Sequence, residues 1–281
     1  MSSTHLNSGT VNLVVALADE AQPLVDHFSL TLEANHEPFR VYTGDGVRLI
    51  VAGVGKLAAA AAVGYLYRWG GNRRDEAWLN VGIAGHAQLP LGTIRLAHKV
   101  TDESSAKRWY PPRILSAECP SCDIRCVDRP DNEYLGKAMV DMESAGFVAA
   151  ASRLATSELV QLAKIISDNR EAPAARVTRQ TIRGLVHDHV DLTKHLMTVL
   201  RDLSAEQIRR AAPTLEFNRF RKRWHFTATQ SSQLRELLRR WEALRPGEPV
   251  MDTISCQTTS RSVLRALRQI LDETAVRIGH E

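Results

Sequence analysis

The chain has 281 residues, of which 44% are hydrophobic and 24% charged, and its formal net charge is +4. This composition is ordinary for a folded globular protein and excludes a low-complexity or disordered chain. The first ten residues, MSSTHLNSGT, lack the apolar core of a signal peptide, and no apolar run is long enough to span a bilayer. We therefore expect a cytoplasmic protein without a membrane partner.

The positive charge is concentrated towards the C-terminus. Residues 196–281 hold 15 Lys and Arg against 10 Asp and Glu, whereas the other residues hold 21 against 22. The basic character therefore belongs to the C-terminal part of the chain.

Strand and helix patterns alternate from the start of the chain. Residues 11–17 (VNLVVAL) are a continuous apolar run, typical of a strand buried on both faces, and residues 21–28 continue as a short helix. Residues 39–43 and 47–51 flank a Gly-Asp-Gly turn, which predicts a β-hairpin.

A glycine turn, GVGK at residues 53–56, then leads into an Ala-rich helix over 57–67. Such a strand–turn–helix unit can expose backbone N–H groups to a ligand, although its spacing excludes a Walker loop. Glycines that only allow close helix packing are the alternative interpretation.

Further strands are predicted at 77–81 and 94–100, and a largely helical pattern at 177–203. This alternation predicts a three-layer α/β/α sandwich with a central mixed sheet over residues 1–203. Residues 204–281 form a basic helical extension in this prediction.

Two stretches in the middle of the chain place carboxylates at the ends of predicted elements. VDMESAG (residues 140–146) opens a helix that reaches residue 154, and LVQLAKIISDN (159–169) is an apolar strand that ends in Ser-Asp-Asn. Acidic residues at a helix start are often caps. A helix start and a strand end that both carry a carboxylate also build a pocket beyond the strand tips of an α/β sheet.

With these stretches, the order of motifs resembles the nucleoside phosphorylase superfamily. VALADEAQPLV, VAGVGKLAAAAA, LNVGIAGHAQLPLGTIRLAHKV and VDMESAG with IISDN follow one another between residues 11 and 169. The closest branch looks like the 5′-methylthioadenosine/S-adenosylhomocysteine nucleosidases, which hydrolyse the bond between adenine and ribose. The resemblance implies a purine nucleosidase that needs no cofactor and forms a homodimer.

The resemblance also implies roles for individual residues. Glu20 matches the carboxylate that activates the attacking water, and Asp168 matches the acid that protonates the purine. Glu143 matches the acceptor for the ribose hydroxyls. The remaining matched positions line the sugar and base pocket or orient Asp168: Val54, Ala84, Gly85, Met142 and Ser167.

The chemistry expected of these carboxylates agrees with the resemblance. A carboxyl that donates a proton near pH 7 must be kept protonated by desolvation or by neighbouring carboxylates such as Glu20 and Glu143. Phosphorylases of the superfamily carry a loop with glycine and arginine where this chain has ALADE (16–20). Without a cation to clamp phosphate, water is the expected nucleophile.

The sequence departs from the nucleosidase pattern in three places. Ile83 replaces a small polar residue, His86 replaces a glycine, and the segment between 100 and 142 is much shorter. Residues 126–130 are interpreted as a remnant of the base-recognition loop carried by that segment. The base and the 5′ substituent of the substrate are left open.

Two other functions remain as alternatives. One is a nucleoside phosphorylase on the same fold. The other is a catalytically degenerate nucleoside-binding module whose basic extension binds a partner or nucleic acid, although the three retained carboxylates argue against it.

Three cysteines, Cys119, Cys122 and Cys126, have a spacing that could hold zinc or an iron–sulfur cluster. No fourth ligand is evident, so incidental thiols are the favoured interpretation and no metal is predicted.

The extension is expected to begin with a helix capped by Ser204, followed by amphipathic helices over 229–244 and 260–278. Residues 217–226 interleave aromatics with cations, as in nucleic-acid patches and in amphipathic docking segments. We expect docking, and nucleic acid is not favoured. The side chains expected to cover the α/β domain are Trp224, Phe226, Leu234, Leu237, Leu238 and Trp241.

Overall fold

The computed structural model describes residues 9–33, 38–115, 119–131, 133–134, 136–211 and 215–274. The chain divides into two compact units, Met1–Arg210 and Ala211–Glu281. The first is a mixed α/β unit and the second is helical.

The described strands of the first unit form one ten-stranded mixed sheet. Its strands are β1 (Val11–Val15), β2 (Thr31–Leu32), β3 (Arg40–Gly44), β4 (Val47–Val51), β5 (Ala77–Gly85), β6 (Ile94–Asp102), β7 (Arg108–Trp109), β8 (Ser121–Cys126), β9 (Met139–Asp141) and β10 (Val160–Asp168). The apolar runs of β1 and β10 are buried along their whole length, as expected of strands covered on both faces.

The centre of the sheet is parallel. Strands β4, β1, β5 and β10 lie side by side in this order and in the same direction. Beyond β10 the sheet curls back to β5. Strand β6 pairs antiparallel with β10, β8 pairs parallel with β6, β9 pairs parallel with β8, and β9 pairs antiparallel with β5. Five strands therefore close into a ring, and the carboxyl ends of β1, β5 and β10 face the same edge.

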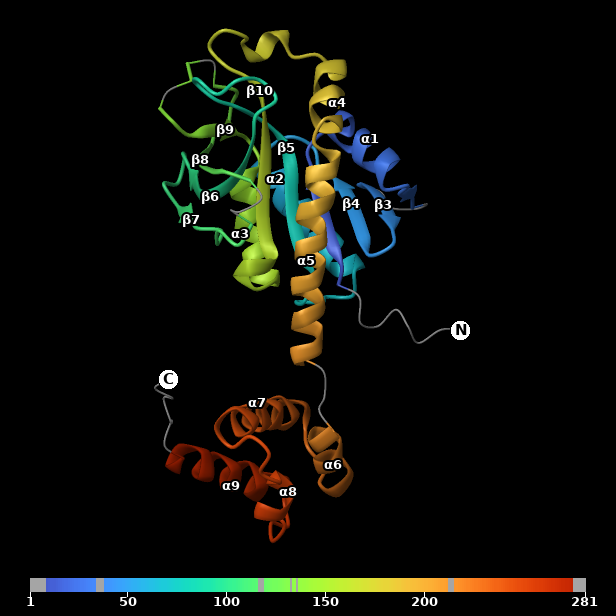
Figure 1. The fold of residues 1–281 in the computed structure, drawn as a ribbon, viewed down its shortest axis with the longest axis vertical. Helices are drawn as coiled ribbons and strands as arrows, with labels where there is room; N and C mark the ends of the chain where they lie inside the picture. Colours follow the sequence, from blue (N-terminus) through green and yellow to red (C-terminus); the bar gives the residue numbers. More distant parts are fainter. Residues whose placement is uncertain are drawn as a thin grey trace. The chain divides into compact units, whose positions relative to one another are not determined.

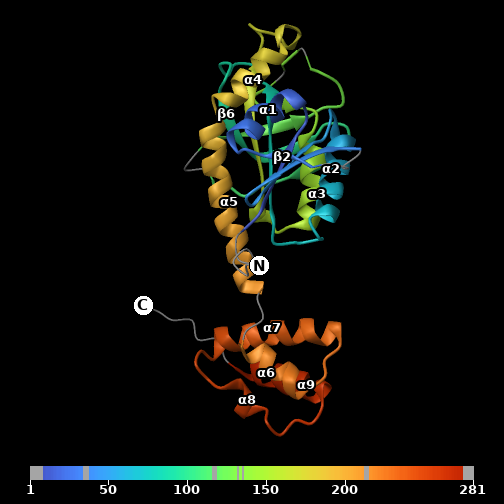
Figure 2. The same ribbon diagram turned by 90° about the vertical axis from the view of Figure 1, so that its right-hand side faces the viewer.

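Helices cover both faces of this sheet, with α1, α4 and α5 on one face and α2 and α3 on the other (Figures 1 and 2). The helices of the first unit are α1 (Ala18–His27), α2 (Lys56–Trp69), α3 (Ser144–Leu154), α4 (Arg179–His187) and α5 (Val190–Ala211). The three-layer α/β fold predicted from the sequence is confirmed. No described helix is long and apolar enough to cross a membrane.

The element prediction differs from the structure in several details. The helical pattern over 177–203 is two helices, because α4 ends at His187 and α5 begins at Val190. Strands β2, β7, β8 and β9 were not predicted. The first two have only two residues and β9 has three, and the alternation of β8 extends over only six residues.

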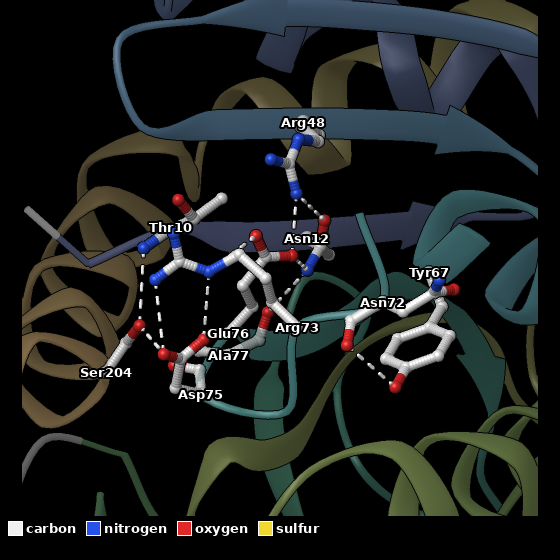
Figure 3. A network of polar contacts seen from close by, with 10 residues as sticks. All are labelled: Thr10, Asn12, Arg48, Tyr67, Asn72, Arg73, Asp75, Glu76, Ala77 and Ser204. Atoms are coloured by element: carbon white, nitrogen blue, oxygen red, sulfur yellow. Dashed lines mark hydrogen bonds and ion pairs between the residues drawn. The ribbon is translucent and has the colours of Figure 1, made fainter. Parts of the chain in front are cut away.

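Ser204 does not cap a helix, because α5 runs through it from Val190 to Ala211. Its buried hydroxyl donates to the Asp75 carbonyl at 2.5 Å and accepts from the Thr10 N–H at 3.3 Å (Figure 3). These contacts tie α5 to the segments just before β5 and β1. The helix therefore belongs to the α/β unit beyond the boundary expected after Leu203.

A second polar cluster lies beside this contact, at the start of the same strands (Figure 3). The buried Glu76 carboxylate accepts from Arg48 at 2.6 Å and from the Asn12 amide at 3.1 Å. Because Arg48 is on β4 and Asn12 on β1, the cluster joins three neighbouring strands at the edge opposite their carboxyl ends.

The second unit has a hydrophobic core of its own. Its helices are α6 (Leu215–Arg223), α7 (Ala228–Leu244), α8 (Val250–Thr253) and α9 (Ser260–Glu273). The six side chains expected to cover the α/β unit pack here together with Phe217, Phe220, Val263 and Leu267. That expectation is therefore wrong: the amphipathic helices bury their apolar faces against one another.

Helices α2 and α3 approach closely at Gly146, where a Cβ would lie 1.9 Å from the Lys56 carbonyl oxygen. We predict that Gly146→Ala lowers the free energy of unfolding by about 1–3 kcal/mol, because two backbones must separate. Gly64→Ala is the matched control, since it is also helical and a Cβ there meets nothing within 4 Å. That control gains about 0.5–1 kcal/mol from helix propensity. Urea denaturation measures both, and a stabilised Gly146→Ala would contradict the close approach.

Candidate active site

A cavity of about 180 Å³ opens at the carboxyl ends of the parallel strands. All eight residues that the sequence analysis assigned to the site line it: Glu20, Val54, Ala84, Gly85, Met142, Glu143, Ser167 and Asp168. They come from five separate parts of the chain, so the fold brings together residues that lie up to 148 positions apart in the sequence.

The sheet explains this convergence. Residues 16–20 follow β1, residues 83–85 end β5, and residues 167–168 end β10. Strand β9 delivers residues 141–143, because its pairing with β5 sets Val140 opposite Gly85. Parallel strands end at one edge of the sheet, and the loops beyond that edge form the usual ligand crevice of α/β folds.

Glu20 is buried and held by three backbone N–H groups. Its Oε2 accepts from Ala16 at 2.8 Å and Leu17 at 2.9 Å, and its Oε1 accepts from Ile83 at 2.9 Å. Burial raises the pKa of Glu20 above its ordinary value, and Lys164 and the N–H groups offset part of that rise. Oε1, with one N–H donor, keeps a lone pair for a further partner.

The neighbouring strand makes room for this carboxylate. A Cβ at Gly82 would lie 2.8 Å from Glu20 Oε1, so a side chain at this position would push the carboxylate away from β5. The glycine turn after β4 holds a second carboxylate, that of Glu143, through a backbone hydrogen bond. Gly55 adopts a φ of 103° that favours glycine, and its N–H donates to Glu143 Oε1 at 2.7 Å.

Glu143 is also buried, and its other oxygen, Oε2, has no protein donor among the described residues. Burial raises the pKa of Glu143, Lys164 lowers it, and the neighbouring Asp141 raises it further. This carboxylate therefore presents one free oxygen to the cavity that it lines.

Lys164 lies in the middle of β10 and is 1% exposed, with its ammonium 2.9 Å from Asp141 Oδ2. Burial alone would lower the pKa of Lys164, but the charges of Asp141, Glu143 and Glu20 outweigh burial and raise it. One buried cation thus interacts electrostatically with three acids. The sequence analysis did not assign this lysine, although a single cation inside the apolar run LVQLAKIIS was a visible signal.

Asp168 ends β10 and accepts two hydroxyl hydrogen bonds. Ser167 Oγ donates to Oδ1 at 2.5 Å, and Tyr134 Oη donates to Oδ2 at 2.7 Å. Gly85 leaves space for this pair, because a Cβ there would lie 2.7 Å from Asp168 Oδ2 and 3.0 Å from the Tyr134 ring. Tyr134 is the second residue that the sequence analysis missed, since it stands outside every motif.

The connection between β8 and β9 contributes to the cavity wall with Val127, Pro130 and Asp131. These positions overlap the segment interpreted as the remnant of a base-recognition loop. His86 is turned to other partners: its Nδ1 accepts from the N–H groups of Gln88 and Leu89, and its Nε2 faces the Lys137 carbonyl at 3.1 Å.

The four cysteines are free thiols. Cys119 and Cys126 are buried in the hydrophobic core, and Cys122 Sγ contacts the Lys137 carbonyl oxygen at 3.4 Å. In the part of the chain that the structure describes, no group of three or more His, Cys, Asp or Glu residues is arranged to hold a metal ion.

No protein-family model and no curated protein matches the chain. Solved structures do. The apo 5′-methylthioadenosine nucleosidase of Arabidopsis thaliana aligns with a TM-score of 0.61 and 18% identity, over 70% of this chain and 99% of that one. The futalosine hydrolase of Helicobacter pylori aligns with a TM-score of 0.57 and 14% identity, over 69% and 99%.

The 5′-methylthioadenosine/S-adenosylhomocysteine nucleosidase of Helicobacter pylori, bound to butyl-thio-DADMe-Immucillin-A, aligns with a TM-score of 0.56 and 14% identity, over 68% of this chain and 98% of that one. The α/β unit therefore has the nucleoside phosphorylase/hydrolase fold. At these identities the likeness establishes the fold, and the chemistry must be argued from the cavity.

We predict that Lys164→Met lowers the free energy of unfolding by about 3–5 kcal/mol at neutral pH, because it leaves buried acids without their cation. Lys164 lowers the pKa of both Glu20 and Glu143, so its loss raises these values further. An acid whose pKa is higher in the folded state binds protons on folding, and stability then falls as pH rises. The deficit is expected to be larger at pH 8 than at pH 5.

Denaturant titrations at the two pH values measure this deficit. Lys194→Met is the matched control, because Lys194 is exposed on α5, and its effect should stay within about 0.5 kcal/mol. A deficit that does not depend on pH would show that the acids do not rely on Lys164.

Proposed function

We propose that the protein is a purine nucleoside N-ribohydrolase that cleaves the N-glycosidic bond of an adenosine-type nucleoside with water. The observation that supports this best is the convergence of Glu20, Glu143 and Asp168 on one cavity at the strand ends. We place the chain nearest to the 5′-methylthioadenosine/S-adenosylhomocysteine nucleosidases, in line with the fold and the ordered motifs.

The surroundings of each carboxylate suit a different task. Asp168 protonates the departing base, which would otherwise leave as a poor anionic group; this type of catalysis is worth roughly 10²–10⁴-fold. Glu20 uses the lone pair of Oε1 to orient the water and take its proton. Its pKa, raised by burial, makes it a stronger base than an exposed glutamate.

Glu143 binds the sugar. Its Gly55 contact fixes one carboxylate oxygen and leaves Oε2 to accept from the ribose hydroxyls. A charged acceptor forms the stronger kind of hydrogen bond and stabilises the positive charge that develops on the sugar ring. Met142 and Val54 supply apolar surface beside it, and Ser167 orients Asp168.

Water is favoured over phosphate as the nucleophile. None of the described residues that line the cavity is Lys or Arg. The nearby cation, Lys164, is buried beneath the acids and bound to Asp141. A phosphate dianion would therefore meet carboxylates without a cationic clamp.

The decisive experiment incubates the full chain with a panel of purine nucleosides and their 5′-thio derivatives, with and without phosphate, and measures free base. Release without phosphate supports the proposal. Release only with phosphate would instead identify a phosphorylase, and no release from any nucleoside would favour a binding module without activity.

We predict that Asp168→Asn abolishes base release and leaves nucleoside affinity within about tenfold, because the amide keeps the shape but has no carboxylic proton. Base release and equilibrium binding are measured on the same preparation. A variant that keeps more than about a tenth of the wild-type kcat would remove Asp168 from the role of general acid.

We predict that Glu143→Gln weakens the discrimination between ribonucleosides and 2′-deoxyribonucleosides, because a charge-assisted acceptor for the hydroxyls is lost. The ratio of kcat/KM for the two sugars is the measurement. Equal losses on both sugars would exclude Glu143 from sugar recognition.

The homodimer and the cytoplasmic location stay predictions. The separate core of the second unit fits a partner-binding module, and nucleic acid is not favoured as its ligand.

A further inference from the structure

The phenol of Tyr134 is buried beside Asp168 and has two hydrogen-bond partners. Its hydroxyl lies 2.7 Å from Asp168 Oδ2, and the Ala174 N–H donates to it at 3.0 Å. The side chain is only 2% exposed, and Arg170 donates to the Tyr134 carbonyl at 3.1 Å. Hydrogen bonds thus fix both the hydroxyl and the backbone of Tyr134.

These partners fix the direction of the hydrogen bond to Asp168. A backbone N–H can only donate, so the Ala174 contact occupies a lone pair of the phenol oxygen. The single hydroxyl proton of Tyr134 then points at Asp168 Oδ2. Burial, together with the Asp168 hydrogen bond, raises the pKa of Tyr134 to about 12, and the phenol keeps this proton at any physiological pH.

The other oxygen of Asp168 has a partner that can turn. Ser167 Oγ lies 2.5 Å from Asp168 Oδ1 and 3.4 Å from the Ala84 carbonyl oxygen. When Asp168 is protonated on Oδ1, the Ser167 hydroxyl can donate to Ala84 instead. Oδ2 has no such freedom, because Tyr134 keeps donating to it in either state.

We propose that Tyr134 is a positioning residue that keeps the proton of Asp168 on Oδ1 and stabilises the carboxylate left after that proton departs. The inference rests on the proposed nucleosidase function and adds a residue to it.

The balance of the step shows why the contact favours catalysis. The Oδ1 proton passes to a nitrogen of the base, and the electron pair of the breaking C1′–N bond goes with the base. Water forms the new C1′–O bond and gives its proton to Glu20. Asp168 becomes a carboxylate in this step, and hydrogen bonds to a charged acceptor are about twice as strong as neutral ones. The Tyr134 contact therefore strengthens as the reaction proceeds, which lowers the barrier.

The experiment compares two leaving groups in the full chain. One substrate is 5′-methylthioadenosine or adenosine, whichever the wild type cleaves faster. The other is 4-nitrophenyl β-D-ribofuranoside, whose nitrophenolate leaves without needing a proton. Tyr134→Phe is expected to lower kcat/KM roughly tenfold to hundredfold on the nucleoside and less than about threefold on the nitrophenyl riboside.

Tyr67→Phe is the matched control, because it removes a half-buried phenol outside the cavity lining that donates to a backbone carbonyl, that of Asn72. Its activity on both substrates should equal that of the wild type. Equal losses of Tyr134→Phe on both substrates would mean that Tyr134 only supports the structure, and would overturn the inference. A wild type inactive on both substrates would overturn the proposed function as well.

If Tyr134→Phe does not fold, a second variant tests the positioning role of Tyr134. Ala174→Pro removes the N–H that orients the phenol and keeps Tyr134 itself. Residue 174 is the first of a short 3₁₀ helix, a position where proline is tolerated. A loss confined to the nucleoside supports the inference, and no loss or an equal loss overturns it.

Discussion

The site depends on one buried cation. Three acids, Asp141, Glu143 and Glu20, lie close to Lys164, and burial raises the pKa of Glu143 and of Glu20. Among the described residues, the ammonium forms an ion pair with Asp141 alone, yet its charge lowers the pKa of Glu20 and Glu143. A buried ion pair is weak evidence for stability. Its value here lies in lowering the pKa of two buried carboxylates that line the cavity.

The fold supplies the remaining donors from its backbone. The N–H groups at the end of β1, at the end of β5 and at the start of α2 all point at carboxylates of the cavity. None of these donors depends on side-chain identity, which fits a fold shared with nucleosidases at 14–18% identity. What the side chains must provide at these points is space, and Gly82 and Gly85 provide it.

The parts of the site that the sequence revealed are those carried by contiguous motifs, such as Glu143 within VDMESAG and Asp168 within IISDN. Lys164 and Tyr134 were missed because their importance arises from tertiary neighbours 23 and 34 positions away. The same reason explains why the sequence did not reveal which surface the helices of the second unit cover. An amphipathic pattern shows that a helix buries one face, but not which surface covers that face.

Glu20 and Asp168 differ in the kind of donor around them, and this difference supports the roles proposed for them. Backbone N–H groups surround Glu20 and can only donate, so they favour its ionised form, as a base requires. Asp168 meets hydroxyls instead, and the Ser167 hydroxyl can turn to donate to the Ala84 carbonyl when Asp168 carries a proton. Such surroundings satisfy a carboxyl both before and after it gives up a proton. Pairs of acids whose environments differ in this way are how one cavity performs acid and base chemistry at a single pH.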